Sequence, residues 1–239
     1  MAHMVAFYPD RENSIEVARA LIDGGCNYLE VQFPFSDPTA DGAYIQKACM
    51  RALEKGFKVH LGFSLISRIR KCSSIPIFIM GYANTVFFHG VKKFLKKCVF
   101  SKVQGLIIPD LPPGYDEGIF ALGKKAGLKI IPVIAPSIKD DRLDEVMSLD
   151  PEYVYAVLRK GITGAYTEIG EDNISFLKKV GAYGVKILAG FGISEKKQVR
   201  SLSPHVHASV VGTAFIKEIM NNHRSNPYKV ITGKMRGLL

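Results

Sequence analysis

The sequence predicts an α/β fold, a single (β/α)8 barrel of the TIM type, because short apolar segments alternate with amphipathic stretches of helical periodicity. Eight such segments in 239 residues leave about 30 residues for each strand with its helix, the size of one βα unit. Strands that are apolar on both faces and joined by helices run parallel. The expected strands are residues 5–7, 28–33, 75–80, 105–108, 130–134, 153–158, 185–189 and 208–211.

The turn after the first strand favours a closed barrel over an open doubly wound sheet. Residues 6–10 read Ala-Phe-Tyr-Pro-Asp, where an open nucleotide-binding sheet usually has a glycine-rich turn. The opening Met-Ala-His-Met resembles an expression remnant, so we exclude residues 1–3 and expect the first strand after Met4. Asn13 and Glu16 predict a capping box at the start of the first helix, which Gly24 and Gly25 end. We expect one domain spanning residues 1–239.

The connecting segments have the apolar spacing of helices that pack on a sheet. This spacing is clearest in residues 45–53 and 91–99, and the second segment carries lysines 92, 93, 96 and 97 on the opposite, solvated side. Their apolar positions are Ile45, Ala48, Cys49, Ala52 and Leu53 in one and Val91, Phe94, Leu95, Cys98 and Val99 in the other.

The composition excludes several classes of protein. With 47% hydrophobic and 23% charged residues the chain has the make-up of a globular protein, and no apolar run approaches the ~20 residues of a membrane span, so we expect a cytoplasmic location. The net charge of +10 comes from lysine doublets rather than an arginine–aromatic patch, so a phosphorylated ligand explains it at least as well as nucleic acid does. The four cysteines form no C-x-x-C pair, and His205 with His207 lacks a third ligand, so we expect no metal site.

Two carboxylates near the second strand are the first candidates for catalysis. In a barrel the active site lies at the carboxyl ends of the strands. Glu30 falls within an apolar strand, where burial should raise its pKa toward that of a general acid or base. An outward-facing glutamate or an ion-pair partner is the alternative. Asp41, in an Ala-Asp-Gly turn, is either functional or an ordinary helix N-cap.

Glycine-bearing turns after the last three strands indicate a phosphate site. They are residues 161–164, 190–194 and 212–213, and glycines allow backbone N–H groups to approach an anion closely. Tight turns that need glycine explain any one of them equally well. Near other strand ends, Tyr82, Asn84 and Asp110 are candidates for orienting a polar ligand.

Residues 29–42 carry a resemblance to a known family. They read Leu-Glu-Val-Gln-Phe-Pro-Phe-Ser-Asp-Pro-Thr-Ala-Asp-Gly, similar to the signature Leu-Glu-Leu-Gly-x-Pro-Phe-Ser-Asp-Pro-x-Ala-Asp-Gly of the tryptophan synthase alpha subunit. The resemblance spans about residues 5–219, and its further matches keep the family's order and spacing. They are Gln46 and residues 82–84, 109–112, 161–164 and 190–194.

The resemblance implies a carbon–carbon lyase of tryptophan biosynthesis that splits indole-3-glycerol phosphate into indole and glyceraldehyde 3-phosphate. Glu30 would be the acid/base at indole C3, and Asp41 would interact with the indole N–H. The implied substrate-binding residues are Tyr155, Thr163, Gly164, Gly192, Gly212 and Thr213. Proton transfers of this kind need no cofactor in this chain.

The resemblance also implies a partner, the tryptophan synthase beta subunit, in an α2β2 heterotetramer. Asp37, Pro38 and Asn84 would face that subunit, which would hold pyridoxal phosphate. In the family the loop after strand six closes over the substrate, which would bring Thr163 near Asp41.

Several positions depart from the family pattern. The helix that covers the amino-terminal end of the barrel is missing, which predicts lower stability. Phe7-Tyr8 replaces Gly-Asp before Pro9, Gln32 replaces glycine, and Leu158 replaces a small hydroxyl residue. Three interpretations are open: a smaller indole pocket, a different ligand, or a subunit kept mainly to activate its partner. Two hypotheses follow: an active lyase, or a catalytically weak regulatory subunit that activates a beta subunit. Another phosphate-binding barrel, such as a sugar-phosphate isomerase, would not explain the signature.

Overall fold

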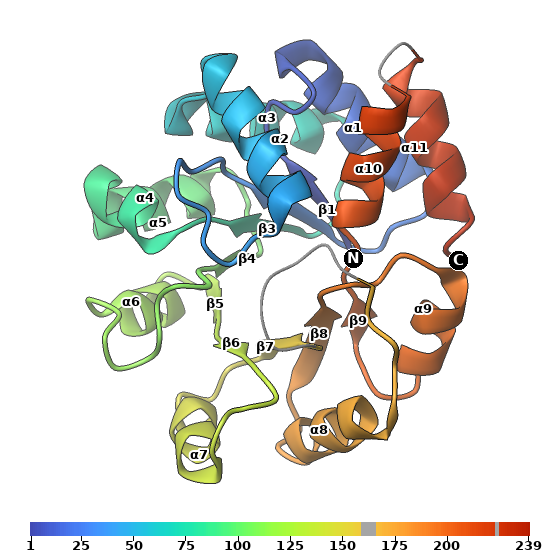
Figure 1. Ribbon diagram of the computed structural model, residues 1–239. Coiled ribbons are helices and arrows are strands. Elements are labelled where there is room, and N and C mark those ends of the chain that lie inside the picture. The colour runs from blue at the N-terminus through green and yellow to red at the C-terminus, as the bar shows by residue number, and fades with distance from the viewer. Residues whose placement is uncertain (159–165, 223–224) are drawn as a thin grey trace.

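A ring of parallel strands surrounded by helices forms the molecule (Figure 1). The computed structural model describes residues 1–158, 166–222 and 225–239. In them the strands run in the orders β1-β2-β3-β4-β5 and β6-β7-β8-β9, every pair parallel. The strands are β1 (Ala2–Val5), β2 (Leu29–Gln32), β3 (Ile77–Met80), β4 (Gly105–Ile107), β5 (Lys129–Ile131), β6 (Val133–Ile134), β7 (Tyr153–Val157), β8 (Lys186–Gly190) and β9 (Ala208–Ser209).

Two junctions join these strands into the expected eight-stranded barrel. β5 and β6 are one strand interrupted at Pro132, which has no N–H for the ladder, although its carbonyl still accepts the N–H of Tyr155 at 2.9 Å. At the other junction Ala2 pairs with Val211, beyond β9. Here the N–H of His3 donates to the Val211 carbonyl at 2.8 Å. The predicted (β/α)8 class is confirmed.

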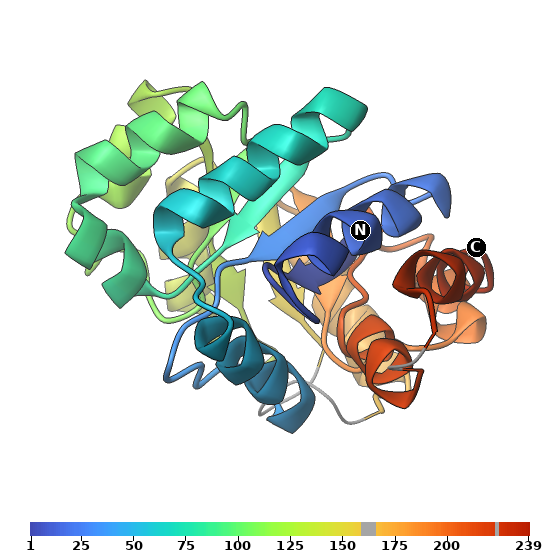
Figure 2. The same cartoon turned by 90° about the horizontal axis from the view of Figure 1, so that it is seen from above.

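The helices cover the outside of the ring, and both ends of the chain lie on the same side of it (Figure 2). On that side α11 packs against α1. The helices are α1 (Arg11–Asp23), α2 (Ala43–Glu54), α3 (Val59–Cys72), α4 (Ala83–His89), α5 (Val91–Phe100), α6 (Ile119–Lys125), α7 (Asp140–Ser148), α8 (Glu171–Gly181), α9 (Lys196–Leu202), α10 (Thr213–Asn221) and α11 (Pro227–Arg236). Among the described residues no helix is long and apolar enough to cross a membrane.

The start of the chain differs from the expectation in two respects. β1 begins at Ala2 rather than after Met4, so residues 1–3, which we had excluded, belong to the barrel. The first helix begins at Arg11 with Asp10 as its N-cap, because the Asp10 carboxylate accepts the N–H groups of Glu12 and Asn13. The predicted capping box at Asn13 is therefore wrong, whereas Gly24 caps the helix end as expected.

Aromatic rings fill the interior of the barrel at its amino-terminal end. The Phe78 ring packs between Tyr28 and Tyr153, with ring centroids 5.9 and 5.7 Å apart. His207 contacts both tyrosines and shares a 2.7 Å hydrogen bond with the Tyr28 hydroxyl. His207 is itself exposed and packs on these tyrosines from the surface, and among the described residues no cluster of metal-ligating side chains exists.

Candidate active site

The two buried carboxylates meet in one cavity inside the barrel. Side chains alternate along a strand, so the inward positions of neighbouring strands converge on the barrel axis. A cavity of about 40 Å³ lies there, lined by His3, Glu30, Ala40, Asp41, Ile45, Met80, Ile107, Pro109, Val133, Tyr155 and Phe191. Residues from both halves of the barrel thus surround the same space, as a barrel active site requires.

Glu30 points into this cavity from β2 and is only 3% exposed. Burial, reinforced by the nearby charge of Asp41, raises the pKa of the Glu30 carboxyl to about 8. Among the described residues its Oε2 has no hydrogen-bond partner. Glu30 therefore does not face outward and has no ion-pair partner among the described residues, and near neutral pH it is predominantly a protonated acid.

Asp41 reaches the cavity from the loop between β2 and α2. It is not the N-cap of α2, because Gly42 occupies that position. Its Oδ2 accepts hydrogen bonds from Gln32 Nε2 at 2.6 Å and from the Tyr82 hydroxyl at 2.9 Å. Burial raises the pKa of Asp41 to about 6, although both hydrogen bonds lower it. At neutral pH Asp41 is thus predominantly a carboxylate beside a neutral Glu30.

The partners of Asp41 also hold its loop. The Tyr82 oxygen accepts the N–H of Ala40 at 3.1 Å, and the Tyr82 ring stacks on Phe35 with centroids 5.3 Å apart. Gln46 Nε2 donates to the Asp41 carbonyl at 2.8 Å. Side chains from the N-cap of α4 and from α2 thus fix the loop that carries the carboxylate, so the orientation of Asp41 is set before any ligand binds.

The departures from the family pattern have different positions. Gln32 lies inside, where its side chain binds Asp41. Phe7 and Leu158 instead belong to the outer core between strands and helices, and Phe7 packs on Phe57 with ring centroids 5.4 Å apart. These two residues therefore do not narrow the cavity. The sequence predicts all three substitutions near the pocket, which is correct for Gln32 and wrong for Phe7 and Leu158.

Tyr155 lines the cavity from β7. It is 8% exposed, and its pKa is raised well above the usual value by burial and by the charges of Glu30 and Asp41. Its ring lies directly over Gly190, where a Cβ atom would stand 2.2 Å from the tyrosine oxygen. Only glycine at the end of β8 leaves room for this ring. Phe191, which we had not singled out, packs on Tyr155 with centroids 6.4 Å apart.

The predicted phosphate-binding residues are partly described. Gly192 follows β8 with a positive φ of 77°, Gly212 is the N-cap of α10, and Thr213 is its first residue. β8 and β9 are neighbours, so these turns lie side by side at the carboxyl ends of the strands. Thr163 and Gly164, with the rest of residues 159–165, lie outside the described residues.

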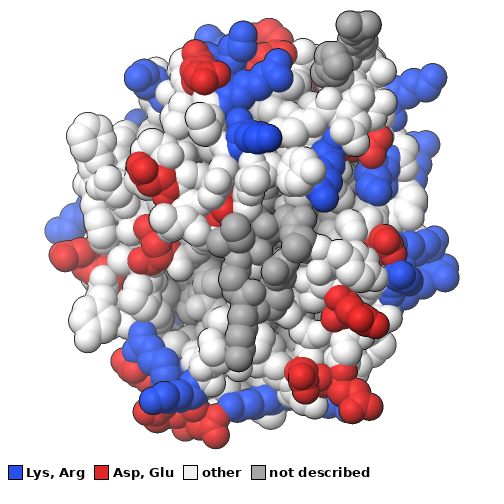
Figure 3. Space-filling view, in the orientation of Figure 1, with Lys and Arg blue, Asp and Glu red and all other residues white. Residues whose placement is uncertain are grey.

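Other candidates lie away from the cavity. Asp110 Oδ1 accepts the N–H of Ala83 at 2.9 Å, so this carboxylate caps the start of α4. Asp37 and Asn84 are exposed, whereas Pro38 is buried. On the face drawn in Figure 3, Lys and Arg side chains alternate with Asp and Glu around the rim, so this face has no continuous basic patch for nucleic acid.

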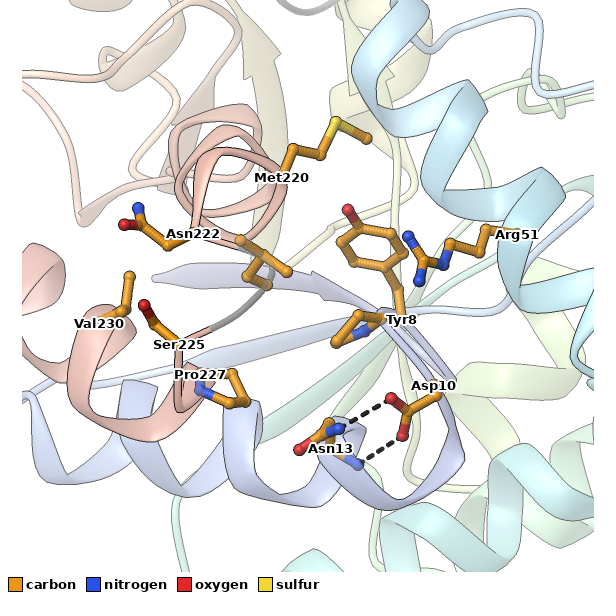
Figure 4. A pocket seen from close by; sticks show the side chains of 11 residues that line it. Tyr8, Asp10, Asn13, Arg51, Met220, Asn222, Ser225, Pro227 and Val230 are labelled. Carbon is orange, nitrogen blue, oxygen red and sulfur yellow. Dashed lines mark hydrogen bonds between the residues drawn. The ribbon is translucent and has the colours of Figure 1, made fainter.

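A larger hollow lies outside the barrel, among α1, α2, α10 and α11 (Figure 4). It measures about 310 Å³ and is lined by polar groups that include Arg51 and Asn222. Its one carboxylate, Asp10, is committed to capping α1. Neither Glu30 nor Asp41 lines it, so the smaller cavity inside the barrel is the candidate active site.

The protein is a (β/α)8 barrel with two buried carboxyl groups in a cavity at the position where enzymes of this fold have their catalytic residues. The sequence model described as "Tryptophan synthase alpha chain" matches residues 1–236. The chain belongs to the tryptophan synthase alpha chain family.

Individual relatives agree with this assignment. The tryptophan synthase alpha chain of Helicobacter hepaticus is 38% identical over 226 residues, covering 92% of this chain and 85% of the relative. That of Christiangramia forsetii is 35% identical, with 94% and 89% covered. Among solved structures, a tryptophan synthase α2β2 complex from Pyrococcus furiosus has a chain that matches with a TM-score of 0.91 and 32% identity, covering 99% of this chain and 96% of that chain.

Proposed function

We propose that this chain cleaves indole-3-glycerol phosphate into indole and glyceraldehyde 3-phosphate, as a carbon–carbon lyase. The observation that carries the proposal is the pairing of a neutral Glu30 with an ionised Asp41 in one buried cavity. Two carboxyl groups whose environments separate their pKa values supply an acid and a base at the same pH. Membership of the family supports the same reaction.

The proposed reaction needs only proton transfers. Glu30 donates its proton to indole C3, while the Asp41 carboxylate accepts a hydrogen bond from the indole N–H and stabilises the positive charge that forms on the ring. The hydroxyl on the carbon attached to C3 loses its proton, and its electrons form the aldehyde as the carbon–carbon bond breaks. This proton restores the acid form of Glu30, so no cofactor is needed in this chain.

The phosphate end of the substrate would lie at the turns after β8 and β9. Gly192, Gly212 and Thr213 can present backbone N–H groups and a hydroxyl there, at the amino-terminal end of α10. We also assign Gly164 and Thr163 to substrate binding, from the family resemblance. The cavity of about 40 Å³ has room for about one water molecule, so binding of an indole ring requires the surrounding side chains and loops to move apart.

We further propose a complex with a tryptophan synthase beta subunit, in which that subunit holds pyridoxal phosphate. A relative of known structure is described as an α2β2 complex. Asp37 and Asn84 are exposed near the carboxyl ends of β2 and β3, and Phe88 on α4 is 94% exposed. An apolar ring so exposed is a natural contact for a partner. Pro38, being buried, would shape the loop rather than contact the partner. Residues 1–239 would act as one domain in this assembly.

Indole release from indole-3-glycerol phosphate tests the proposal. The purified chain should release indole, faster when a beta subunit is added, and Glu30→Gln should abolish release while still binding the partner. Glu54→Gln, at an exposed position on α2, is the matched control and should keep full activity. A wild-type chain that activates the beta subunit but releases no indole would overturn the lyase and establish the regulatory function.

A further inference from the structure

His3 lies beside Glu30 inside the barrel. The parallel register of β1 and β2 places His3 opposite Glu30, and both side chains line the cavity. His3 is 7% exposed, as deeply buried as the apolar residues around it. A polar ring at this inward position therefore faces the same space as the two carboxylates.

The His3 ring has an unused hydrogen-bonding atom. Among the described residues, Nε2 is buried and has no partner. An orphan polar atom of this kind lowers the stability of the fold, and a phenylalanine of similar shape would avoid this cost. Burial lowers the pKa of His3 to about 4, so the ring is neutral near pH 7 and carries one donor and one acceptor nitrogen.

The His3 ring also lies against Gly212, in the turn where the phosphate of the proposed substrate would bind. A Cβ atom on Gly212 would lie 2.7 Å from His3 Nδ1, so the imidazole occupies the space that a side chain at Gly212 would fill. His3 thus lies between Glu30 on β2 and the turn that begins α10. In the proposed substrate, the part that joins the indole ring to the phosphate is the three-carbon chain with its two hydroxyl groups.

We propose that His3 is a substrate-binding and specificity-determining residue, whose Nε2 hydrogen-bonds a hydroxyl of the glycerol chain. This inference rests on the lyase function proposed above. A hydroxyl both donates and accepts, so it pairs with the imidazole in either tautomer. The buried nitrogen also selects against ligands that lack the hydroxyl, because such ligands leave Nε2 unpaired.

Two ligands and three variants test this role. Binding is measured by titration calorimetry in the Glu30→Gln background, which prevents turnover of indole-3-glycerol phosphate. The second ligand is indole-3-propyl phosphate, which keeps the ring and the phosphate but has no hydroxyl. His3→Phe retains the aromatic shape, His3→Asn retains a hydrogen-bonding group, and Met4→Leu alters the adjacent buried side chain of β1 as the control.

His3→Phe should weaken binding of indole-3-glycerol phosphate about tenfold and leave binding of indole-3-propyl phosphate unchanged or tighter. His3→Asn should lose less affinity for the hydroxylated ligand than His3→Phe, and Met4→Leu should bind both ligands like the parent. Equal losses for both ligands, or no loss for either, would overturn the role of His3. If the parent binds neither phosphate, the lyase function itself fails, and the inference fails with it.

Discussion

Replacing Glu30 with glutamine should stabilise the folded protein, and the gain should increase with pH. In the folded state the pKa of Glu30 is about 8, against 4.5 for an ordinary glutamic acid. A group whose pKa is raised by folding contributes its full stability below the unfolded value and loses it as the pH rises to the folded value. Glutamine carries no charge at any pH, so Glu30→Gln avoids this loss.

The size of the effect follows from the two pKa values. Between pH 4.5 and 8 the wild type should lose about 1.4 kcal/mol per pH unit relative to Glu30→Gln. The difference in free energy of unfolding should therefore be near its minimum at pH 4.5, about 3 kcal/mol larger at pH 7 and about 4 kcal/mol larger at pH 8 and above. The slope of one proton per pH unit is the characteristic sign of the Glu30 carboxyl.

Urea unfolding of both proteins from pH 4.5 to 9 measures this difference directly. Glu54→Gln is the control, because its exposed side chain stays in solvent and its substitution should shift stability equally at every pH. A pH-independent difference between wild type and Glu30→Gln would refute the argument, since it would mean that Glu30 is ionised in the folded protein. The same variant should release no indole, so stability and activity change in opposite directions.

Three further predictions concern the cavity. The kcat/KM for indole release should peak near pH 7. It should fall tenfold per pH unit below about 6, where Asp41 is protonated, and above about 8, where Glu30 is ionised. A pH-rate profile without these two limbs would contradict the assigned roles. Tyr82→Phe removes a hydrogen-bond donor from the Asp41 carboxylate, so the pKa of Asp41 should rise and the acidic limb should move to higher pH by roughly one unit. An unchanged acidic limb would show that this hydrogen bond does not lower the pKa of Asp41. Gly190→Ala places a Cβ atom 2.2 Å from the Tyr155 oxygen and should lower the free energy of unfolding, measured by chemical denaturation, by about 1–3 kcal/mol. An unchanged free energy of unfolding would mean that the Tyr155 ring can move aside.

Local sequence patterns predicted the barrel and the two carboxylates of its candidate active site. Apolar segments and helical spacing each involve residues a few positions apart, so they predicted the strands and their parallel order without knowledge of the fold. The position of Glu30 within a strand, and of Asp41 in the following turn, predicted two carboxylates at the same end of the barrel. Here the family resemblance added roles to residues that the pattern had already singled out.

The tertiary structure alone decided which side chains face the cavity. Closure of the ring pairs Ala2 with Val211, more than 200 residues along the chain, and this pairing brings Ala2 and His3 into β1, with His3 facing inward. The fold also directs Gln32 of β2 toward Asp41 and leaves Phe7 in the outer core. A shift of one residue in a strand exchanges its inward and outward faces, and the register comes from distant pairings. The sequence therefore predicted the carboxylates, whereas their hydrogen-bond partners and the neighbouring imidazole depended on contacts that no local pattern encodes.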